Sequence, residues 1–426
     1  MSQDFYNKIV FLLKSEMISA FGCTEPIAVA LAGAKAREVL GAMPKKITIK
    51  CSANIIKNVK GVAIPTTDGM RGIDVACTLG AIAGRPELGL EVLREVKKEN
   101  LDQLKEYLQQ GICKVESLDS EDNLDIICIA ENDQDTVEVE ILYSHDNIVL
   151  VKKNSEVLLD NRELNQGHDG INLSKLKFDD IYKFATTYDL GGLKYLLDQE
   201  IAYNDAIAQE GLKSGYGAQV GRAILGRLSN IQADDNLHEV IKAHAAAGSD
   251  ARMSGCTLPV TINSGSGNQG MTILSTVYQY AKFLKVEREL LHRALVLANL
   301  CAIWQKSGIG KLSAFCGAVN AASAASGAIT YLKGGCKEQI ENAVSNTLLA
   351  AAGIWCDGAK PACALKIAIA VDCALIASEM AMLGQAFNSG EGLAKDSLEQ
   401  TVRVICQIAK SGMKATDKKI IELMLK

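Results

Sequence analysis

Three cysteines in the C-terminal half of the chain have a spacing that could hold a metal cluster. Cys316 precedes a segment of small residues, and Cys356 and Cys363 flank "DGAKPA" between two apolar segments. Pro and Gly interrupt helices, so the pattern predicts a kink or tight loop between two buried helices. It lacks the paired C-x2-C knuckles of a zinc ribbon and the cysteine run of a ferredoxin. Three thiolates could hold three irons of a cubane and leave one iron open, or all three could be small buried hydrophobic residues.

The glycine-rich stretch "NSGSGNQG", residues 263–270, is a second candidate site. Its glycines match the G-x-G-x-x-G fingerprint of dinucleotide-binding proteins, but the surrounding pattern is helical and lacks the downstream acidic residue. The alternatives are a helix cap and an anion cradle, in which Ser264, Ser266 and Asn268 join backbone N–H groups in binding a carboxylate. Arg252, in the preceding "SDARMSG", could clamp the same carboxylate or form a surface salt bridge.

Cys23 and Lys57 are the candidates for moving a proton. Cys23 stands in "FGCTEP" ahead of Pro26 at a predicted helix start. A helix N-terminus lowers the pKa of a thiol, although a plain capping role fits equally well. Lys57 and Asn58 follow an apolar run, so Lys57 could be a partly buried base, while the pattern alone favours a solvated position.

Composition narrows the classes of function. The chain has 426 residues, of which 48% are hydrophobic and 5% aromatic, and its net charge of −5 makes an electrostatic nucleic-acid binder an unsuitable interpretation. We expect no membrane span and no signal peptide, because Gly, Pro or charge interrupts every apolar run. The 13 cysteines are an odd number, which favours free or metal-bound thiols in a reducing cytoplasm.

The periodicity along the chain predicts an α+β protein with a large, Ala-rich, all-helical domain and a smaller α+β domain. Residues 1–43 have helical spacing, 45–59 alternate as in a strand, and 112–160 contain several short strands separated by Asn and Asp. We therefore expect an α+β domain at 44–165, a linker within 159–180 and a helical catalytic domain at 175–426. The N-terminal helices are expected to dock on the helical domain, because the segment around Cys23 resembles a site.

Taken together, these motifs resemble the iron–sulfur L-cysteine desulfidases, relatives of the alpha chain of bacterial iron–sulfur L-serine dehydratases. The resemblance covers nearly the whole chain. It is carried by "FGCTEP", "NIIKNVKGVAIP", "SDARMSG", "NSGSGNQG", "KLSAFCGAV" and "WCDGAKPAC", of which the last two are the most specific. It implies that Cys316, Cys356 and Cys363 bind a 4Fe–4S cluster, and that the enzyme eliminates the β-substituent of an amino acid without pyridoxal phosphate.

This resemblance predicts a reaction. The open iron would bind the β-thiol of L-cysteine, and Arg252 and the 263–270 loop would hold the α-carboxylate. Asn58 would be a further substrate-binding residue, and Lys57 or Cys23 would take the α-proton. Loss of sulfide would then give pyruvate and ammonia. The chain has no cysteine after Cys406, unlike single-chain serine dehydratases, which favours L-cysteine as the substrate together with the preference of iron for soft thiolate.

Other functions stay open at this point. The first is dehydration of L-serine or another β-substituted amino acid by the same site. A nicotinamide-dependent oxidoreductase and a non-catalytic thiol- or metal-sensing protein are alternatives of other classes. We expect a small amino acid as the ligand and a homodimer as one possible assembly.

Overall fold

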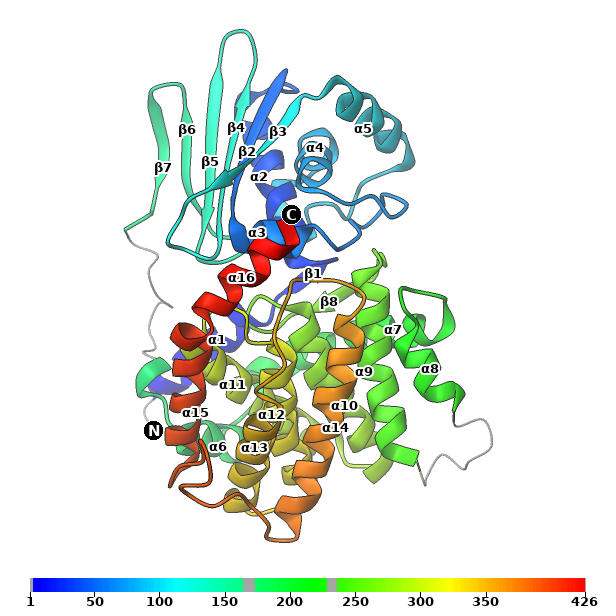
Figure 1. Cartoon of the computed structure of the whole chain (residues 1–426), viewed down its shortest axis with the longest axis vertical. Coiled ribbons are helices and arrows are strands. Elements are labelled where there is room, and N and C mark those ends of the chain that lie inside the picture. Colours follow the sequence, from blue (N-terminus) through cyan, green and yellow to red (C-terminus); the bar gives the residue numbers. More distant parts are fainter. Residues whose placement is uncertain (1–2, 164–172, 228–235, 426) are drawn as a thin grey trace.

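The computed structural model describes residues 3–163, 173–227 and 236–425, which form two parts that lie against each other (Figure 1). One part is a six-stranded mixed sheet with helices packed on it, and the other is a bundle of helices. This arrangement confirms the predicted α+β class. Residues 164–172 of the predicted linker lie outside the described residues. Within the described part of the chain, no helix is long and apolar enough to cross a membrane.

The sheet has the strand order β3-β2-β4-β5-β6-β7, in which only β2 and β3 run parallel. Inward side chains of the central strands, such as Ile126 and Val139, are fully buried, whereas their neighbours along each strand are more exposed. The strands are β2 Lys46–Ser52, β3 Cys113–Leu118, β4 Asp125–Glu131, β5 Thr136–Leu142, β6 Ile148–Lys153 and β7 Glu156–Asp160. The alternation of apolar and polar residues therefore predicted the positions of these strands well.

Two helices pack on the inner face of this sheet, α2 (Thr24–Leu40) and α4 (Ile73–Ala83), and α5 (Lys98–Gln110) packs on α4. A short 3-10 helix, η1 (Pro86–Glu91), contacts α2. Gly80 shows how closely α2 and α4 approach each other: a Cβ at this position would lie 2.0 Å from the carbonyl oxygen of Ala30. Small residues thus let α2 and α4 meet backbone to backbone.

The N-terminal helices do not stay together, which differs from the expectation for residues 1–43. Helix α1 (Gln3–Glu16) buries Ile9 and Leu13 in the core of the helical part. Helix α2 instead shares its core with the sheet, since its residues 24–34 are all buried and fit between the sheet and α4. Between them, β1 (Ser19–Phe21) pairs with β8 (Pro259–Thr261) of the helical part, and so joins the two parts.

The predicted strand over 45–59 is only half correct. Strand β2 ends at Ser52, and residues 53–59 form helix α3 (Ala53–Val59), because the run "NIIKNV" buries Asn54, Ile55 and Val59 at helical spacing. Lys57 and Asn58 therefore lie on a short helix that follows the sheet. This helix lies where the two parts meet (Figure 1).

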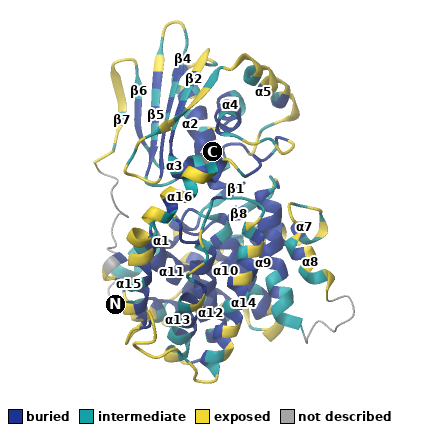
Figure 2. Cartoon of the chain, viewed as in Figure 1, coloured by how far each residue is buried: buried dark blue, intermediate teal, exposed yellow. Residues whose placement is uncertain are grey.

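The helical part has helix α12 near its centre, packed against α10, α11, α13 and α14 (Figure 1). Its sequence "GAVNAASAASGAITYL" is almost entirely buried, and small side chains let the neighbours approach (Figure 2). The helices are α6 Phe178–Thr187, α7 Lys194–Lys213, α8 Val220–Gly226, α9 Leu237–Met253, α10 Gly267–Leu284, α11 Arg288–Ile309, α12 Gly317–Leu332, α13 Lys337–Ala351, α14 Cys363–Met382, α15 Leu398–Gln407 and α16 Lys414–Leu425. Short turns are η2 Leu173–Lys175, η3 Gly191–Leu193 and the π-type η5 Ile408–Gly412.

The last helix, α16, leaves the bundle and packs against α3 of the sheet part (Figure 1). The C-terminal segment is thus a second connection between the two parts, in addition to the β1–β8 pair. Residues near both chain ends therefore help to fix how the sheet part is held over the helical part.

Candidate functional site

The loop that connects α13 to α14 holds Cys356 opposite Cys316. The backbone N–H of Cys316 donates to Ile354 (3.1 Å), and that of Cys356 donates to Ala314 (2.6 Å), so the two segments pair like strands. Cys363 is the first residue of α14. Segments forty residues apart in the sequence are thereby brought together, as the predicted loop requires.

Gly358 allows this loop to turn against α3. Its φ is +92°, a conformation that L side chains rarely adopt, and a Cβ there would lie 2.5 Å from the carbonyl oxygen of Lys57. Asp357 is held in place by Lys360, at 2.8 Å, and by Lys366 of α14. The cysteine loop is therefore wedged between α14 and the sheet part.

These thiols line a cavity of about 90 Å³ between the two parts. One water needs roughly 10–15 Å³ measured in this way, so the cavity has room for a small ligand. Eight of the ten predicted site residues line it: Cys23, Asn58, Arg252, Ser266, Asn268, Cys316, Cys356 and Cys363. Glu25, Gln269, Lys306 and Lys311 are further polar residues of its wall. The motifs read from the sequence thus converge on one place.

Two of the three cysteine thiols are held in the protonated form by burial when no cation is near. Burial, with a contribution from the neighbouring thiols, raises the pKa of Cys316 to about 12, and burial likewise raises the pKa of Cys363. The ammonium groups of Lys360 and Lys366 act in the opposite direction on Cys363. Such thiols are poor nucleophiles but lose their protons when they bind metal.

The donor set fits an iron–sulfur cluster better than a single ion. In the described residues, no three His, Cys, Asp or Glu side chains are grouped closely enough to hold one metal ion. A 4Fe–4S cluster is held differently, because each thiolate binds its own iron and the thiols stand around the cluster. Three thiols around one cavity, walled by Gly317, Ala318 and Gly358, meet that requirement.

Arg252 is the cationic side of this cavity. It is 2% exposed, and its Nη1 lies 3.3 Å from Oδ1 of Asn268, while Nε and Nη2 have no partner among the described residues. The guanidinium lies against Gly267, the first residue of α10, where a Cβ would approach Nε to 2.3 Å. The alternative of a surface salt bridge is therefore wrong, and the group is free to bind an anion.

The glycine-rich stretch is a turn into α10. Ser266 caps the helix, since its Oγ accepts from the N–H of Gln269 at 3.4 Å, and the first turn of α10 faces the cavity. The preceding strand β8 has three residues in a two-stranded antiparallel sheet, so no βαβ unit exists here and the dinucleotide interpretation does not fit the fold. An anion cradle is consistent with this geometry.

Ser264 does not line the cavity and belongs to a buried polar network at the turn. Its Oγ donates to Asn263 (2.9 Å), whose Nδ2 donates to Asn299 (2.9 Å), and the Nδ2 of Asn299 lies 3.1 Å from both oxygens of Glu200. Burial raises the pKa of Glu200 to about 8. This network supports the turn from within the bundle.

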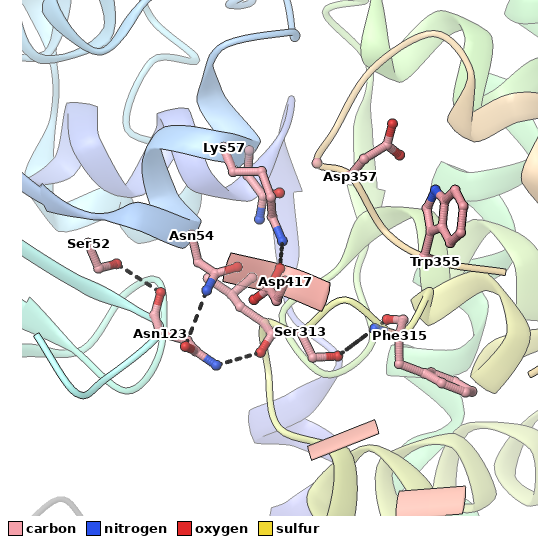
Figure 3. Close-up of polar contacts among 12 residues, drawn as sticks. Ser52, Asn54, Lys57, Asn123, Ser313, Phe315, Trp355, Asp357 and Asp417 are labelled. Atoms are coloured by element: carbon pink, nitrogen blue, oxygen red, sulfur yellow. Dashed lines mark hydrogen bonds and ion pairs between the residues drawn. The ribbon is translucent and has the colours of Figure 1, made fainter. Parts of the chain in front are cut away.

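Lys57 does not face the cavity either. Its side chain is 1% exposed, and Nζ forms an ion pair of 2.6 Å with Asp417 of α16, as Figure 3 shows. Nearby, Asn123 joins Asn54 of α3 (3.2 Å) to the carbonyl of Leu312 (2.9 Å). These contacts hold α3 in place, and they do not bring Lys57 to a ligand in the cavity.

Cys23 lines the cavity as predicted, but its pKa shifts in the direction opposite to the one expected. Burial and the adjacent Glu25 carboxylate raise the pKa of the thiol well above its ordinary value, and Arg252 opposes this only in part. Cys23 precedes α2 as its N-cap, yet Sγ donates to Glu25 at 3.0 Å. The negative neighbour and the lack of solvent outweigh the helix N-terminus.

Sequence reasoning missed three charged residues of the cavity wall, Glu25, Lys306 and Lys311. Glu25 stands inside the motif "FGCTEP", two residues after Cys23. Lys306 follows an uncharged stretch of α11, residues 294–304, and burial lowers its pKa to about 8. A charge at the end of such a long uncharged stretch was the signal that could have identified Lys306.

Comparisons with known proteins agree with these motifs. The family model of the serine dehydratase alpha chain matches residues 87–422. A UPF0597 protein of Lachnoclostridium phytofermentans is 44% identical over 420 residues, which cover 99% of this chain and 100% of the relative. A UPF0597 protein of Finegoldia magna is 45% identical over 415 residues, 97% of this chain and 98% of the relative. The chain belongs to the serine dehydratase alpha chain family, which supports a dehydratase-like lyase.

Proposed function

We propose that this protein eliminates sulfide from L-cysteine without pyridoxal phosphate and without net redox change. The products are hydrogen sulfide, pyruvate and ammonia. The observation that carries the proposal is the convergence of Cys316, Cys356 and Cys363 on the same small cavity as the unpaired guanidinium of Arg252. The cysteines that would bind a metal cluster and the arginine that would bind a carboxylate are thereby adjacent, as an elimination from an amino acid requires.

Cys316, Cys356 and Cys363 would hold a 4Fe–4S cluster through their three thiolates. When bound, such a cluster supplies a Lewis-acid position that stabilises a departing thiolate, and iron favours soft sulfur over the hydroxyl of serine. Around it, Lys360 and Lys366 place positive charge beside the cysteine loop. The chain thus supplies both the ligands and part of the charge compensation that an anionic centre needs.

Arg252 and Asn268 would bind the α-carboxylate at the N-terminus of α10. The unpaired Nε and Nη2 of Arg252 are buried, so an arriving carboxylate gains charge-assisted hydrogen bonds in a site shielded from water. Ser266 keeps the helix capped, and Gly267 leaves room for the guanidinium. The carboxylate is therefore oriented before any bond breaks.

Lys306 is a better proton acceptor than the predicted Lys57. It lines the cavity and forms no ion pair with another described residue, whereas Lys57 is paired with Asp417. The amine of Lys306 would take the α-proton, the C–H electron pair would form the Cα–Cβ double bond, and the β C–S bond would break with its electrons leaving on sulfur. The resulting 2-aminoacrylate then hydrolyses to pyruvate and ammonia.

Anaerobic purification with iron and sulfide analysis tests the ligand assignment. We expect about four irons and four sulfides per chain, the content of a cubane. Alanine at Cys316, Cys356 or Cys363 should remove the visible absorbance, while Cys373→Ala and Cys406→Ala are matched controls that should retain it. A triple variant of the three proposed ligands that keeps a full cluster would disprove the assignment.

Product analysis tests the reaction. L-cysteine should give sulfide, pyruvate and ammonia in equal amounts, and L-serine should react more slowly. Faster turnover of L-serine would replace the desulfidase proposal by a serine dehydratase at the same site. Inertness of the cluster-loaded protein toward both amino acids would favour a sensing role.

A further inference from the structure

The cavity has an anionic side as well as a cationic one. Glu25 is 8% exposed, lines the cavity, and lies in the first turn of α2. Its pKa is lowered to about 2: burial acts to raise it, but His145 and the Cys23 thiol outweigh burial. Glu25 is therefore a carboxylate over the whole physiological range, facing the same small space as Arg252.

Donors hold the Glu25 carboxylate in place without neutralising it fully. Nδ2 of Asn58 donates to Oε1 at 3.1 Å, and Sγ of Cys23 donates to Oε2 at 3.0 Å. The only basic side chain within 4 Å of it in the described part of the chain is His145, whose Nε2 is 3.7 Å from Oε1. No Lys or Arg side chain pairs with this carboxylate in the described part of the chain, so a cationic group of a ligand has no competitor there.

A free acceptor accompanies this carboxylate. Oδ1 of Asn58 is buried and has no hydrogen-bond partner among the described residues, and Asn58 lines the cavity. An ammonium group has three N–H donors and no acceptor, so it matches a wall that offers a carboxylate and an amide oxygen. A metal ion would require more than these groups, and the described residues contain no set of three ligating side chains here.

Cys23 lines the same cavity as Glu25 and Arg252. Its thiol responds to both, since burial and then Glu25 raise its pKa while Arg252 lowers it. Glu25 and Arg252 nevertheless form no ion pair with each other. Glu25 and Arg252 are therefore placed so that each can bind an opposite charge of the same ligand.

We propose that the cavity recognises its ligand as a zwitterion, with Glu25 and Asn58 binding the α-ammonium group while Arg252 binds the α-carboxylate. Glu25 is then the residue that selects α-amino acids over carboxylates that lack the amine. The inference rests on the proposed function only in taking this cavity as the substrate site. A carboxylate that is as weak a base as Glu25 suits binding of a cation better than abstraction of an α-proton.

Equilibrium binding to the full, cluster-loaded chain tests this inference without turnover. L-alanine and propionate differ only by the α-ammonium group, and neither has a β-substituent to eliminate. The wild-type protein should bind L-alanine about 10-fold to 100-fold more tightly than propionate, as expected for a charge-assisted contact. Glu25→Gln should remove most of that advantage and leave the propionate affinity unchanged.

Glu200→Gln is the matched control, because Glu200 is also a buried glutamate but does not line the cavity. It should preserve the ratio of the two affinities, whereas Arg252→Met should weaken both ligands. Equal loss of both ligands in Glu25→Gln, or a wild-type protein that binds them equally, would overturn the inference. Retained discrimination in a protein that releases no sulfide would support the inference and overturn only the lyase proposal.

Discussion

The cavity and the α3–α16 junction each contain a buried lysine, but only the lysine at the junction has a counter-ion among the described residues. At the junction, Lys57 has its partner Asp417 at 2.6 Å, and the pair is closed off from solvent and from the cavity (Figure 3). In the cavity wall, Lys306 is 6% exposed and forms no ion pair with a described residue. Arg252 repeats the second pattern, since its Nε and Nη2 have no partner among the described residues.

The difference separates charges that hold the fold from charges that await a ligand. Desolvation of an ion is offset when a counter-ion is near, so a paired lysine such as Lys57 can be a structural element. An unpaired buried charge lowers the stability of the fold. The presence of such a charge is explained when a ligand of opposite charge binds to it. Several such charges around one cavity therefore mark a site more strongly than any single motif.

Replacing the two lysines should give the largest contrast. Lys306→Met should lower kcat by about 10²–10⁴-fold, the usual effect of removing a general base, with the cluster content unchanged. The double variant Lys57→Met/Asp417→Leu removes the buried pair together and should keep kcat within about tenfold of wild type. Steady-state sulfide release and iron analysis on the same samples measure both.

This comparison fails if the double variant loses as much kcat as Lys306→Met. In that case Lys57 would be the base that its position in "NIIKNV" suggested. Full activity of Lys306→Met would remove Lys306 from the reaction and leave Cys23 as the remaining candidate acceptor.

The sequence predicted the site better than the roles within it. Cys316, Cys356 and Cys363 were selected through the family resemblance of their motifs, because their spacing alone left open that all three are small buried hydrophobic residues. The partner of Lys57 lies 360 residues away, so no local pattern could show that this lysine is paired. Likewise, α2 packs on the sheet because of contacts made with α4 and β4, which its own periodicity does not reveal.

The pKa of Cys23 is a second case in which the local rule was overridden. A helix N-terminus acts over one turn, but the thiol is 1% exposed and donates to a carboxylate. Burial depends on the whole fold, and it determines the direction in which the pKa of Cys23 shifts. Fold class and strand positions were predictable because they rest on periodicity, which is local.

The second prediction concerns stability at the α3–α16 junction. Lys57→Met alone leaves the Asp417 carboxylate largely buried without a partner and should lower the free energy of unfolding by about 3–5 kcal/mol. The double variant Lys57→Met/Asp417→Leu should recover most of that loss, because neither charge remains. Urea denaturation of the wild type, both single variants and the double variant completes the thermodynamic cycle.

Additive losses in this cycle would show that the two side chains do not interact. The junction would then be held by other contacts, such as those of Asn54 and Asn123, and the contrast with the cavity would lose its basis.

The last prediction concerns Glu200, a buried acid that needs neither a counter-ion nor a ligand because it remains protonated. Its pKa is raised by burial to about 8, against 4.5 ordinarily, so folding takes up a proton between these two pH values. The stabilising contribution of the protonated form is complete below about pH 4.5 and is lost as pH rises through 8. Glu200→Gln cannot titrate but can still accept from Asn299. The wild type should therefore lose stability relative to Glu200→Gln by up to about 1.4 kcal/mol per pH unit within this window. Urea denaturation of the two proteins at pH 5, 6.5 and 8 isolates this residue, since all other groups titrate alike in both. A stability difference that stays constant over this range would mean that Glu200 is ionised in the fold and that its charge is compensated as fully as that of Lys57.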